Sequence, residues 1–228
     1  MSGRRSHKGR PRSAVWAELD QMPDFSNTRY ANVFATPLIT HVWDDGPGLN
    51  LSLRERILVH ETENPGIGKS NHGGWHSETG QLEFCGDAGR RLIAHMHELA
   101  DEATRRVFAE KTMDAPPCRW TLSAWANVNR SGDFNHVHVH PASTWSGTYY
   151  VDAGEPSDSD RGAPLHLFDP CQGRSMAFLR TLPSSVYVHP KPGLMVLFPS
   201  YVPHMVFPHN GSSARISIAF NLRADPYP

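Results

Sequence analysis

The second half of the chain alternates short apolar runs with Gly, Pro and other turn residues. From residue 119 onward, eight runs are rich in β-branched or aromatic residues and are predicted as β-strands. They cover residues 119–129, 134–140, 146–152, 164–169, 184–189, 193–199, 204–208 and 214–222. Because no helical crossovers separate them, the pattern favours an antiparallel sandwich or jelly-roll barrel over a parallel α/β sheet.

The first half is typical of helical and loop support. A helix is predicted over residues 87–110, because apolar residues recur there at three- and four-residue steps: Leu92, Met96, Leu99, Ala103 and Val107. A second helix is predicted over 51–64, with Ser52 near its N-terminal cap. Residues 32–43 predict one or two strands broken at Pro37. Residues 70–80 lack either period and are expected to form an ordered loop near the barrel mouth.

These elements predict one domain of mainly β (α+β) class, with helices packed on one face of a β core. Of 228 residues, 39% are apolar, which is enough for one sizeable core. We expect a disordered basic arm over residues 1–13 and a single domain over 14–228. Within that domain, residues 14–118 give helical and loop support, and 119–223 form the β core.

Charge and cysteine content narrow the function classes. The arm holds five Lys and Arg and no acid, which leaves −6 for the rest of a chain whose formal net charge is −1. Such an arm could contact phosphates, but short basic termini are more often solubilising tails. A nucleic-acid partner is therefore not indicated. With no secretory h-region, no long apolar run and three widely spaced cysteines, we expect reduced thiols, a cytoplasmic location and no membrane span.

The segment DFNHVHVHP places three histidines in alternation with valines. In an extended strand, His136, His138 and His140 would project from one face. Two histidines two residues apart, joined by a ligand from a distant strand, can hold one face of an octahedral iron and leave three positions open. His204 is the best distal candidate, because it begins a predicted strand. Beyond it, Arg215 and Ser217 share a strand face and could bind a carboxylate.

Several motifs then make the chain similar to a family of iron(II)- and 2-oxoglutarate-dependent oxygenases. The H-x-H-P, S-x-x-S-G-x-Y-Y and L-F-P-S patterns of that family occur in order in WANVNRSGDFNHVHVHPASTWSGTYYVD and GLMVLFPSYVPHMVFPHNGSSARISIAFN, with LFDP between them. The match runs from about Trp125 to Asn221, and SNHGGWHS is a weaker upstream match. The resemblance implies a double-stranded β-helix of jelly-roll or cupin-like type, with iron(II), 2-oxoglutarate and oxygen.

The resemblance also implies iron ligands. His138 and His204 match the two histidine ligands of the family, and His140 stands where the wider superfamily has a carboxylate. We expect all three to bind iron, because Pro141 fixes the frame of H-x-H-P. Two alternatives stay open: His136 serves together with His138, or His140 lies outside the coordination sphere and water completes it.

Further residues are expected around the metal. Arg215 and Ser217 match the R-x-S that binds the far carboxylate of 2-oxoglutarate, and Tyr150 matches a tyrosine that faces the cosubstrate in some relatives. Asn127 and Asn129 share a strand face and could donate hydrogen bonds to cosubstrate or substrate. The candidates for substrate contact in Gly- and Ser-rich loops are Trp75 and Trp145, which could equally pack in the core.

The function implied is oxidation of a C–H bond in a small metabolite or amino-acid-like substrate, with succinate and CO2 as coproducts. Hydroxylation, desaturation and ring closure would use the same residues. A homodimer is compatible with the sequence. Two rival hypotheses are a three-histidine dioxygenase whose substrate chelates iron without 2-oxoglutarate, and a non-catalytic β-barrel that binds a ligand or a partner.

Overall fold

The computed structural model describes residues 26–29, 34–108, 118–155, 163–171, 173 and 184–225. The chain divides into two units, Met1–Ala35 and Thr36–Pro228. Every helix and strand reported below belongs to the second unit. The predicted basic arm lies outside the described residues, so its disorder and the domain boundary at residue 14 stay predictions.

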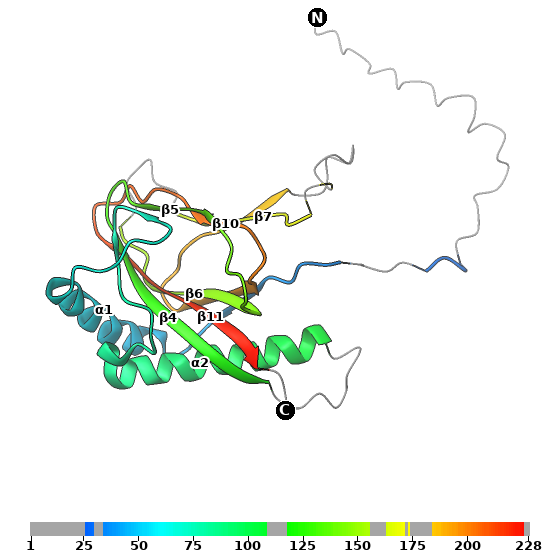
Figure 1. Cartoon of the computed structure of the whole chain (residues 1–228), viewed down its shortest axis with the longest axis horizontal. Helices are drawn as coiled ribbons and strands as arrows, with labels where there is room; N and C mark the ends of the chain where they lie inside the picture. Colours follow the sequence, from blue (N-terminus) through cyan, green and yellow to red (C-terminus); the bar gives the residue numbers. More distant parts are fainter. Residues whose placement is uncertain are drawn as a thin grey trace, which may run out of the picture. The chain divides into compact units, whose positions relative to one another are not determined.

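Two antiparallel sheets form the core of the second unit (Figure 1). Within the described ranges, the major sheet has six strands in the order β1-β9-β6-β11-β4-β3, and the minor sheet has five in the order β2-β5-β10-β7-β8. The bounds in the major sheet are β1 Ile39–Val42, β9 Leu194–Pro199, β6 Trp145–Asp152, β11 Arg215–Asp225, β4 Arg119–Asn129 and β3 Trp75–His76. Those in the minor sheet are β2 Asn71–His72, β5 Phe134–His138, β10 His204–Val206, β7 Leu165–Phe168 and β8 Ser185–Val188. All eight predicted strands are present, and the mainly β class is confirmed.

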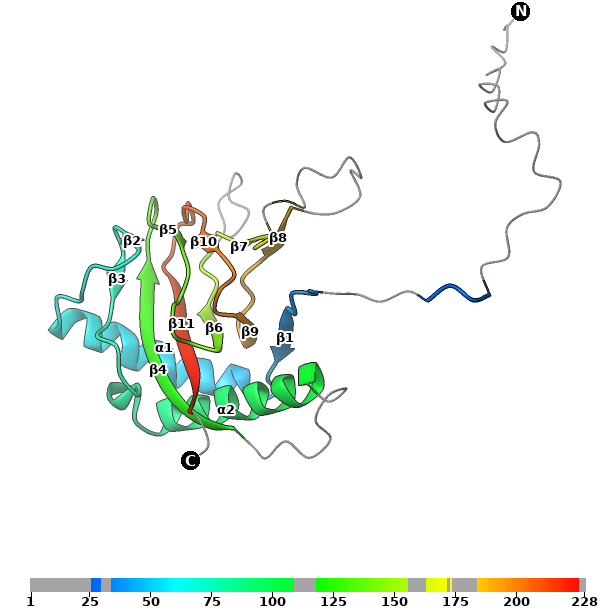
Figure 2. The same cartoon turned by 45° about the vertical axis from the view of Figure 1, so that its right-hand side comes forward.

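The helices cover the outer face of the major sheet (Figure 2). Helix α1 (Gly46–Glu63) is followed by the short 3-10 helix η2 (Glu83–Cys85) and by helix α2 (Gly86–Phe108). Most of the apolar stripe predicted for α2 faces inward, where Leu92 and Met96 are fully buried in the main core, but Val107 at its end is exposed. In the part of the chain that the structure describes, neither helix is apolar enough over 18 residues to cross a bilayer.

Helix α1 and strand β1 begin at different residues from those that the sequence predicts. Helix α1 begins at Gly46 rather than near Ser52, which is an exposed residue inside the helix. Pro47 occupies the first turn, where the backbone N–H that proline lacks has no intrahelical partner. The described part of the 32–43 segment forms one strand, β1, which starts two residues after Pro37.

The predicted loop over residues 70–80 contains two short strands, one in each sheet. β2 pairs with β5 of the minor sheet, and β3 pairs with β4 of the major sheet. Gly73 and Gly74 connect them with φ near +62°, a conformation that glycine adopts without a steric penalty. Two-residue strands are too short to give an alternating pattern, so the sequence indicated only a loop here.

Close packing at Gly147 of β6 predicts a measurable loss of stability. A Cβ atom at this position would lie 2.5 Å from the Val196 carbonyl oxygen and against the Phe220 ring. We expect Gly147→Ala to lower the free energy of unfolding by about 1–3 kcal/mol, because backbone and ring must both move. Urea unfolding monitored by circular dichroism measures the change.

The matched control is Gly48→Ala in helix α1, where an added Cβ meets nothing within 4 Å. It should leave stability unchanged or raise it by about 0.5–1 kcal/mol, since alanine favours the helix. Equal stability of Gly147→Ala and the parent would contradict the packing described here.

Candidate metal and cosubstrate site

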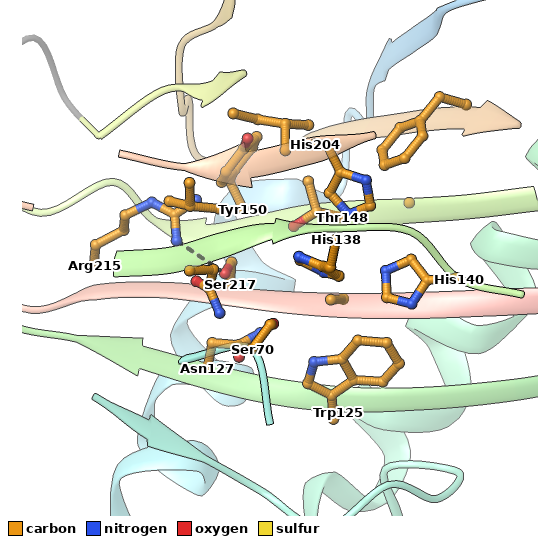
Figure 3. Close-up of a pocket in the computed structure, with 16 residues that line it drawn as sticks. Ser70, Trp125, Asn127, His138, His140, Thr148, Tyr150, His204, Arg215 and Ser217 are labelled. Carbon is orange, nitrogen blue, oxygen red and sulfur yellow. Dashed lines mark hydrogen bonds between the residues drawn. The ribbon is translucent and has the colours of Figure 1, made fainter. Parts of the chain in front are cut away.

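A pocket between the two sheets contains most of the predicted site residues (Figure 3). Its lining comes from β4, β6, β9 and β11 of the major sheet, and from β5, β7 and β10 of the minor sheet. The residues that matter for its chemistry are His138, His140, His204, Arg215, Ser217, Tyr150, Asn127, Trp125, Asn135 and Ser70. None of the lining residues is Asp, Glu or Lys.

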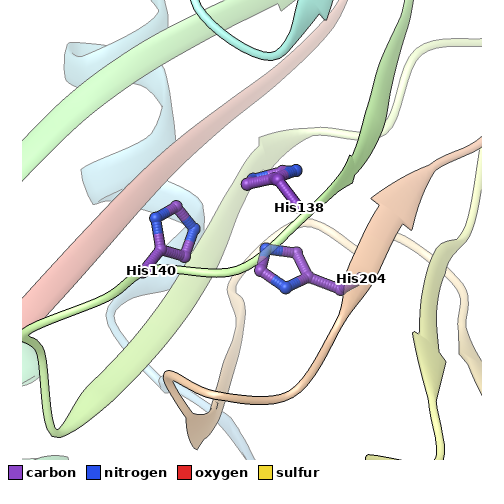
Figure 4. Close-up of side chains that lie close together, drawn as sticks. All are labelled: His138, His140 and His204. Carbon is purple, nitrogen blue, oxygen red and sulfur yellow. The ribbon is translucent and has the colours of Figure 1, made fainter.

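Three histidine side chains meet at the centre of this pocket. One ring nitrogen from each of His138, His140 and His204 lies within 4.8 Å of the others (Figure 4). The ring centroids of His138 and His204 are 4.3 Å apart, and that of His140 is 4.9 Å from His138 and 5.1 Å from His204. This spacing suits a single ion bound by all three rings, because metal–nitrogen bonds of about 2 Å bring ligand atoms this close.

Strand pairing positions the three rings. His204 opens β10 directly opposite His138, the last residue of β5, so the two side chains share the inner face of the minor sheet. His140 follows beyond the end of β5, where its backbone N–H donates to the Ser200 carbonyl at 3.0 Å. Two segments more than 60 residues apart in the chain thus contribute to one cluster.

His136 does not share a face with His138 and His140, contrary to the alternation expected. Between the His204–His138 and Val206–Asn135 pairs, β5 has two residues where β10 has one. This bulge turns His136 outward, where it is exposed, while Asn135 and His138 both line the pocket. Strict period-2 alternation fails at a bulge, and nothing in the residue types of DFNHVHVHP marks its position.

Hydrogen bonds fix how the imidazoles present their nitrogens. His138 Nδ1 lies 2.6 Å from the His136 carbonyl, and His204 Nδ1 lies 2.9 Å from the Val202 carbonyl. A carbonyl only accepts, so Nδ1 carries the proton in both rings and Nε2 keeps its lone pair. Burial, with a further contribution from neighbouring histidines, lowers the pKa of His140 to about 4 and that of His204 to about 3. Burial also lowers the pKa of His138. At neutral pH the rings are neutral, as metal binding requires.

Arg215 lies at one end of the pocket with its charge uncompensated. The side chain is 2% exposed, and no ion pair among the described residues includes it. One guanidinium nitrogen donates to Ser217 Oγ at 3.1 Å and to Asn129 Oδ1 at 3.4 Å, while Nε has no partner there. The guanidinium carbon lies 5.1 Å from the centre of the Tyr150 ring.

The remaining polar candidates surround Arg215. Ser217 stands opposite Asn127 on β4 and Tyr150 on β6, so the three side chains share one row across the inner face of the major sheet. The Tyr150 hydroxyl is buried without a hydrogen-bond partner in the described structure. The pocket therefore brings Arg215, Ser217, Tyr150 and Asn127 together, with Asn129 one row further along β4.

The two tryptophans predicted to touch substrate lie elsewhere. Trp75 and Trp145 are buried in the main core, where Trp75 donates to the Asn64 carbonyl and Trp145 to Thr104 of α2. Trp125, which was not predicted, lines the pocket 5.8 Å from the His140 ring. The signal for it was the alternation WANVN, in which Trp125 and Asn127 share a strand face.

A known protein family resembles part of this chain in sequence, and solved structures resemble it in fold. A family model described as "Putative 2OG-Fe(II) oxygenase" matches residues 123–221. No curated protein matches the sequence. Among solved structures, a prolyl-4-hydroxylase from Pseudomonas putida is similar with a TM-score of 0.56 at 16% identity, covering 83% of this chain and 93% of that one.

Two further structures have the same fold. A prolyl hydroxylase from Trichoplax adhaerens, solved with a hypoxia inducible factor peptide fragment, gives a TM-score of 0.55 at 14% identity, with 82% of this chain and 83% of that chain covered. HygX from Streptomyces hygroscopicus, solved with nickel and 2-oxoglutarate, gives 0.52 at 13%, with 84% of each chain covered.

The β core therefore has the same jelly-roll fold as these solved structures. The segment of the chain that is similar to the 2OG-Fe(II) oxygenase family, residues 123–221, runs from β4 to β11. The family match contains the three histidines, Arg215 and Ser217, but begins after the segment that carries Ser70.

The buried histidines predict a pH dependence for the metal-free protein. Their pKa values lie below the ordinary value of 6.5, so between about pH 6.5 and 4 the folded protein binds fewer protons than the unfolded chain. The free energy of unfolding should therefore fall as the pH is lowered through this range. Urea midpoints at pH 7.5 and 5.0 measure the fall.

In His204→Gln this fall should be smaller, because one buried ring that resists protonation is gone. The same substitution at the exposed His72 should leave the pH dependence of the parent intact. An equal fall in the parent and in His204→Gln would show that His204 does not contribute.

Proposed function

We propose that His138, His140 and His204 bind one iron(II) and that Arg215 binds the far carboxylate of 2-oxoglutarate. The observation that carries this proposal is the buried guanidinium, which opens on the same pocket as the three imidazoles. A buried charge without a counter-ion is costly, and a bound carboxylate would remove that cost. Ser217 would add one hydroxyl donor beside the fork of the guanidinium.

The donor set fits iron(II). Three neutral imidazoles lie close enough to share one ion, and in His138 and His204 a backbone carbonyl holds the Nδ1 proton, so that Nε2 keeps its lone pair. The missing carboxylate makes this site one charge more positive than a two-histidine, one-carboxylate site. It would thus favour a cosubstrate that is itself a dianion, such as 2-oxoglutarate.

The bound cofactors would supply the oxidation. Iron(II) and 2-oxoglutarate would together supply the electrons that reduce dioxygen, with one oxygen atom entering the substrate C–H bond, the other entering succinate, and CO2 released. The protein's residues bind and orient: Arg215 and Ser217 anchor the cosubstrate, Tyr150 packs beside it, and Leu165, Phe198 and Val206 exclude water from the centre.

The substrate that fits best is a small uncharged or amino-acid-like group. Apart from Arg215 and the histidines, the lining offers amides, hydroxyls and the Trp125 ring, but no carboxylate or ammonium group. A charged group at the metal would therefore lack a protein counter-ion. The similar structures include prolyl hydroxylases, one with a bound peptide fragment, so a neutral side chain on a peptide belongs to the same range.

An anaerobic titration tests the proposal. Metal-free protein receives iron(II) and then 2-oxoglutarate, and the visible charge-transfer band of the chelate is recorded. We expect the band in the parent, and at least a tenfold weaker 2-oxoglutarate affinity in Arg215→Met, because a desolvated charge-assisted contact is worth more than about 1.4 kcal/mol. Iron binding itself should persist in this variant.

Arg119→Met is the matched control, since Arg119 is an exposed residue at the far end of β4 from Asn129. It should bind 2-oxoglutarate like the parent. If iron binds and no band forms, a three-histidine dioxygenase without 2-oxoglutarate would replace this proposal. If iron does not bind, the non-catalytic barrel would.

A further inference from the structure

One side chain beside the cluster connects His140 to the major sheet. Asn221 of β11 stands opposite Ser146 on β6 and Ser123 on β4. Its Nδ2 donates to His140 Nδ1 at 3.3 Å, and its Oδ1 accepts a hydrogen bond of 2.7 Å from Ser146 Oγ. Ser146 is 1% exposed, so this chain of contacts is shielded from water at its inner end.

His140 differs from the other two histidines in this contact. The Nδ1 atoms of His138 and His204 face backbone carbonyls, which can only accept a hydrogen bond. His140 instead faces a side-chain amide, which can donate through nitrogen or accept through oxygen. With Asn221 as donor, His140 Nδ1 is the acceptor and the ring proton sits on Nε2, the atom that a metal would need.

A metal on His140 Nε2 requires the reverse arrangement. The proton must move to Nδ1, which then needs an acceptor. Rotation of the Asn221 amide by 180° supplies one, because its oxygen and nitrogen have nearly the same shape. Ser146 accommodates the rotation, since its hydroxyl can accept from Nδ2 as readily as it donated to Oδ1.

We infer that Asn221 is a positioning residue for His140, and that its amide reverses when metal binds, with Ser146 as the partner that permits the reversal. The inference rests on the proposed function, in which His140 is the third iron ligand. An accepting amide oxygen behind His140 would give the ring the tautomer that the backbone carbonyls give to His138 and His204. It would orient a neutral ligand at the place where the wider superfamily has a carboxylate.

Cobalt(II) binding to the metal-free full chain tests the inference without turnover. The dissociation constant and the visible ligand-field spectrum are measured for Asn221→Leu, Asn221→Asp and Ser146→Ala. We expect Asn221→Leu to weaken binding by about 10- to 100-fold, as loss of a group that orients a ligand does. Asn221→Asp, which can only accept, should bind at least as tightly as the parent. Ser146→Ala should weaken binding by about threefold.

Ser123→Ala is the matched control, because Ser123 flanks Asn221 from β4 and has no described hydrogen bond to Asn221, Ser146 or His140. Its affinity should equal that of the parent. Thermal unfolding of each metal-free variant shows whether that variant is folded. If a variant at Asn221 does not fold, Ser146→Ala still tests the inference.

The outcomes separate this inference from the proposed function. If His140→Ala weakens cobalt binding but Asn221→Leu binds as tightly as the parent or more tightly, the positioning role is wrong and the three-histidine site stands. Equal weakening by Asn221→Asp and Asn221→Leu would also reject an accepting role. If His138→Ala weakens binding and His140→Ala does not, the third ligand of the proposed function is wrong, and the inference fails with it.

Discussion

The buried charge of Arg215 is the constraint on which the arrangement of polar residues inside this barrel depends. A guanidinium cannot lose its proton at any ordinary pH, so its cost can be offset only by polar neighbours or by an anion. The neighbours that the structure describes are neutral: a serine hydroxyl, an asparagine carbonyl and the face of a tyrosine ring. The row of polar residues along β4, β6 and β11 is therefore arranged around one cation.

The two sheets contribute different residues to the pocket. The major sheet, backed by helices α1 and α2, carries Arg215 at one end of the pocket and contributes residues to the main hydrophobic core. The minor sheet supplies His138 and His204 from short strands, and His140 lies where the chain crosses from one sheet to the other. His140 is fixed at this crossing by contacts with Ser200, in the connection from β9 to β10, and with Asn221 of β11.

Sequence reasoning predicted the eight strands, both helices and several of the polar residues that gather in the pocket, because these depend on period, turn chemistry and motif order. It did not predict the bulge that turns His136 outward, since bulges depend on pairing with β10 rather than on local residue types. The start of α1 was missed because Gly46 and Pro47 have turn propensity that tertiary packing overrides. Trp75 and Trp145 were predicted to contact substrate because Gly and Ser surround them in the sequence. In the structure, burial against α1 and α2 decides their positions.

The link between β2 and β3 has a consequence for how proteins of this kind can diverge. It ties the minor sheet to the major sheet through one Gly-Gly turn, and Ser70 beside it forms part of the pocket wall. The family match begins well after it, at residue 123. The three histidines and Ser70 are thus encoded in separate stretches of the chain. A change at Ser70 would alter one part of the pocket wall without altering the histidine cluster.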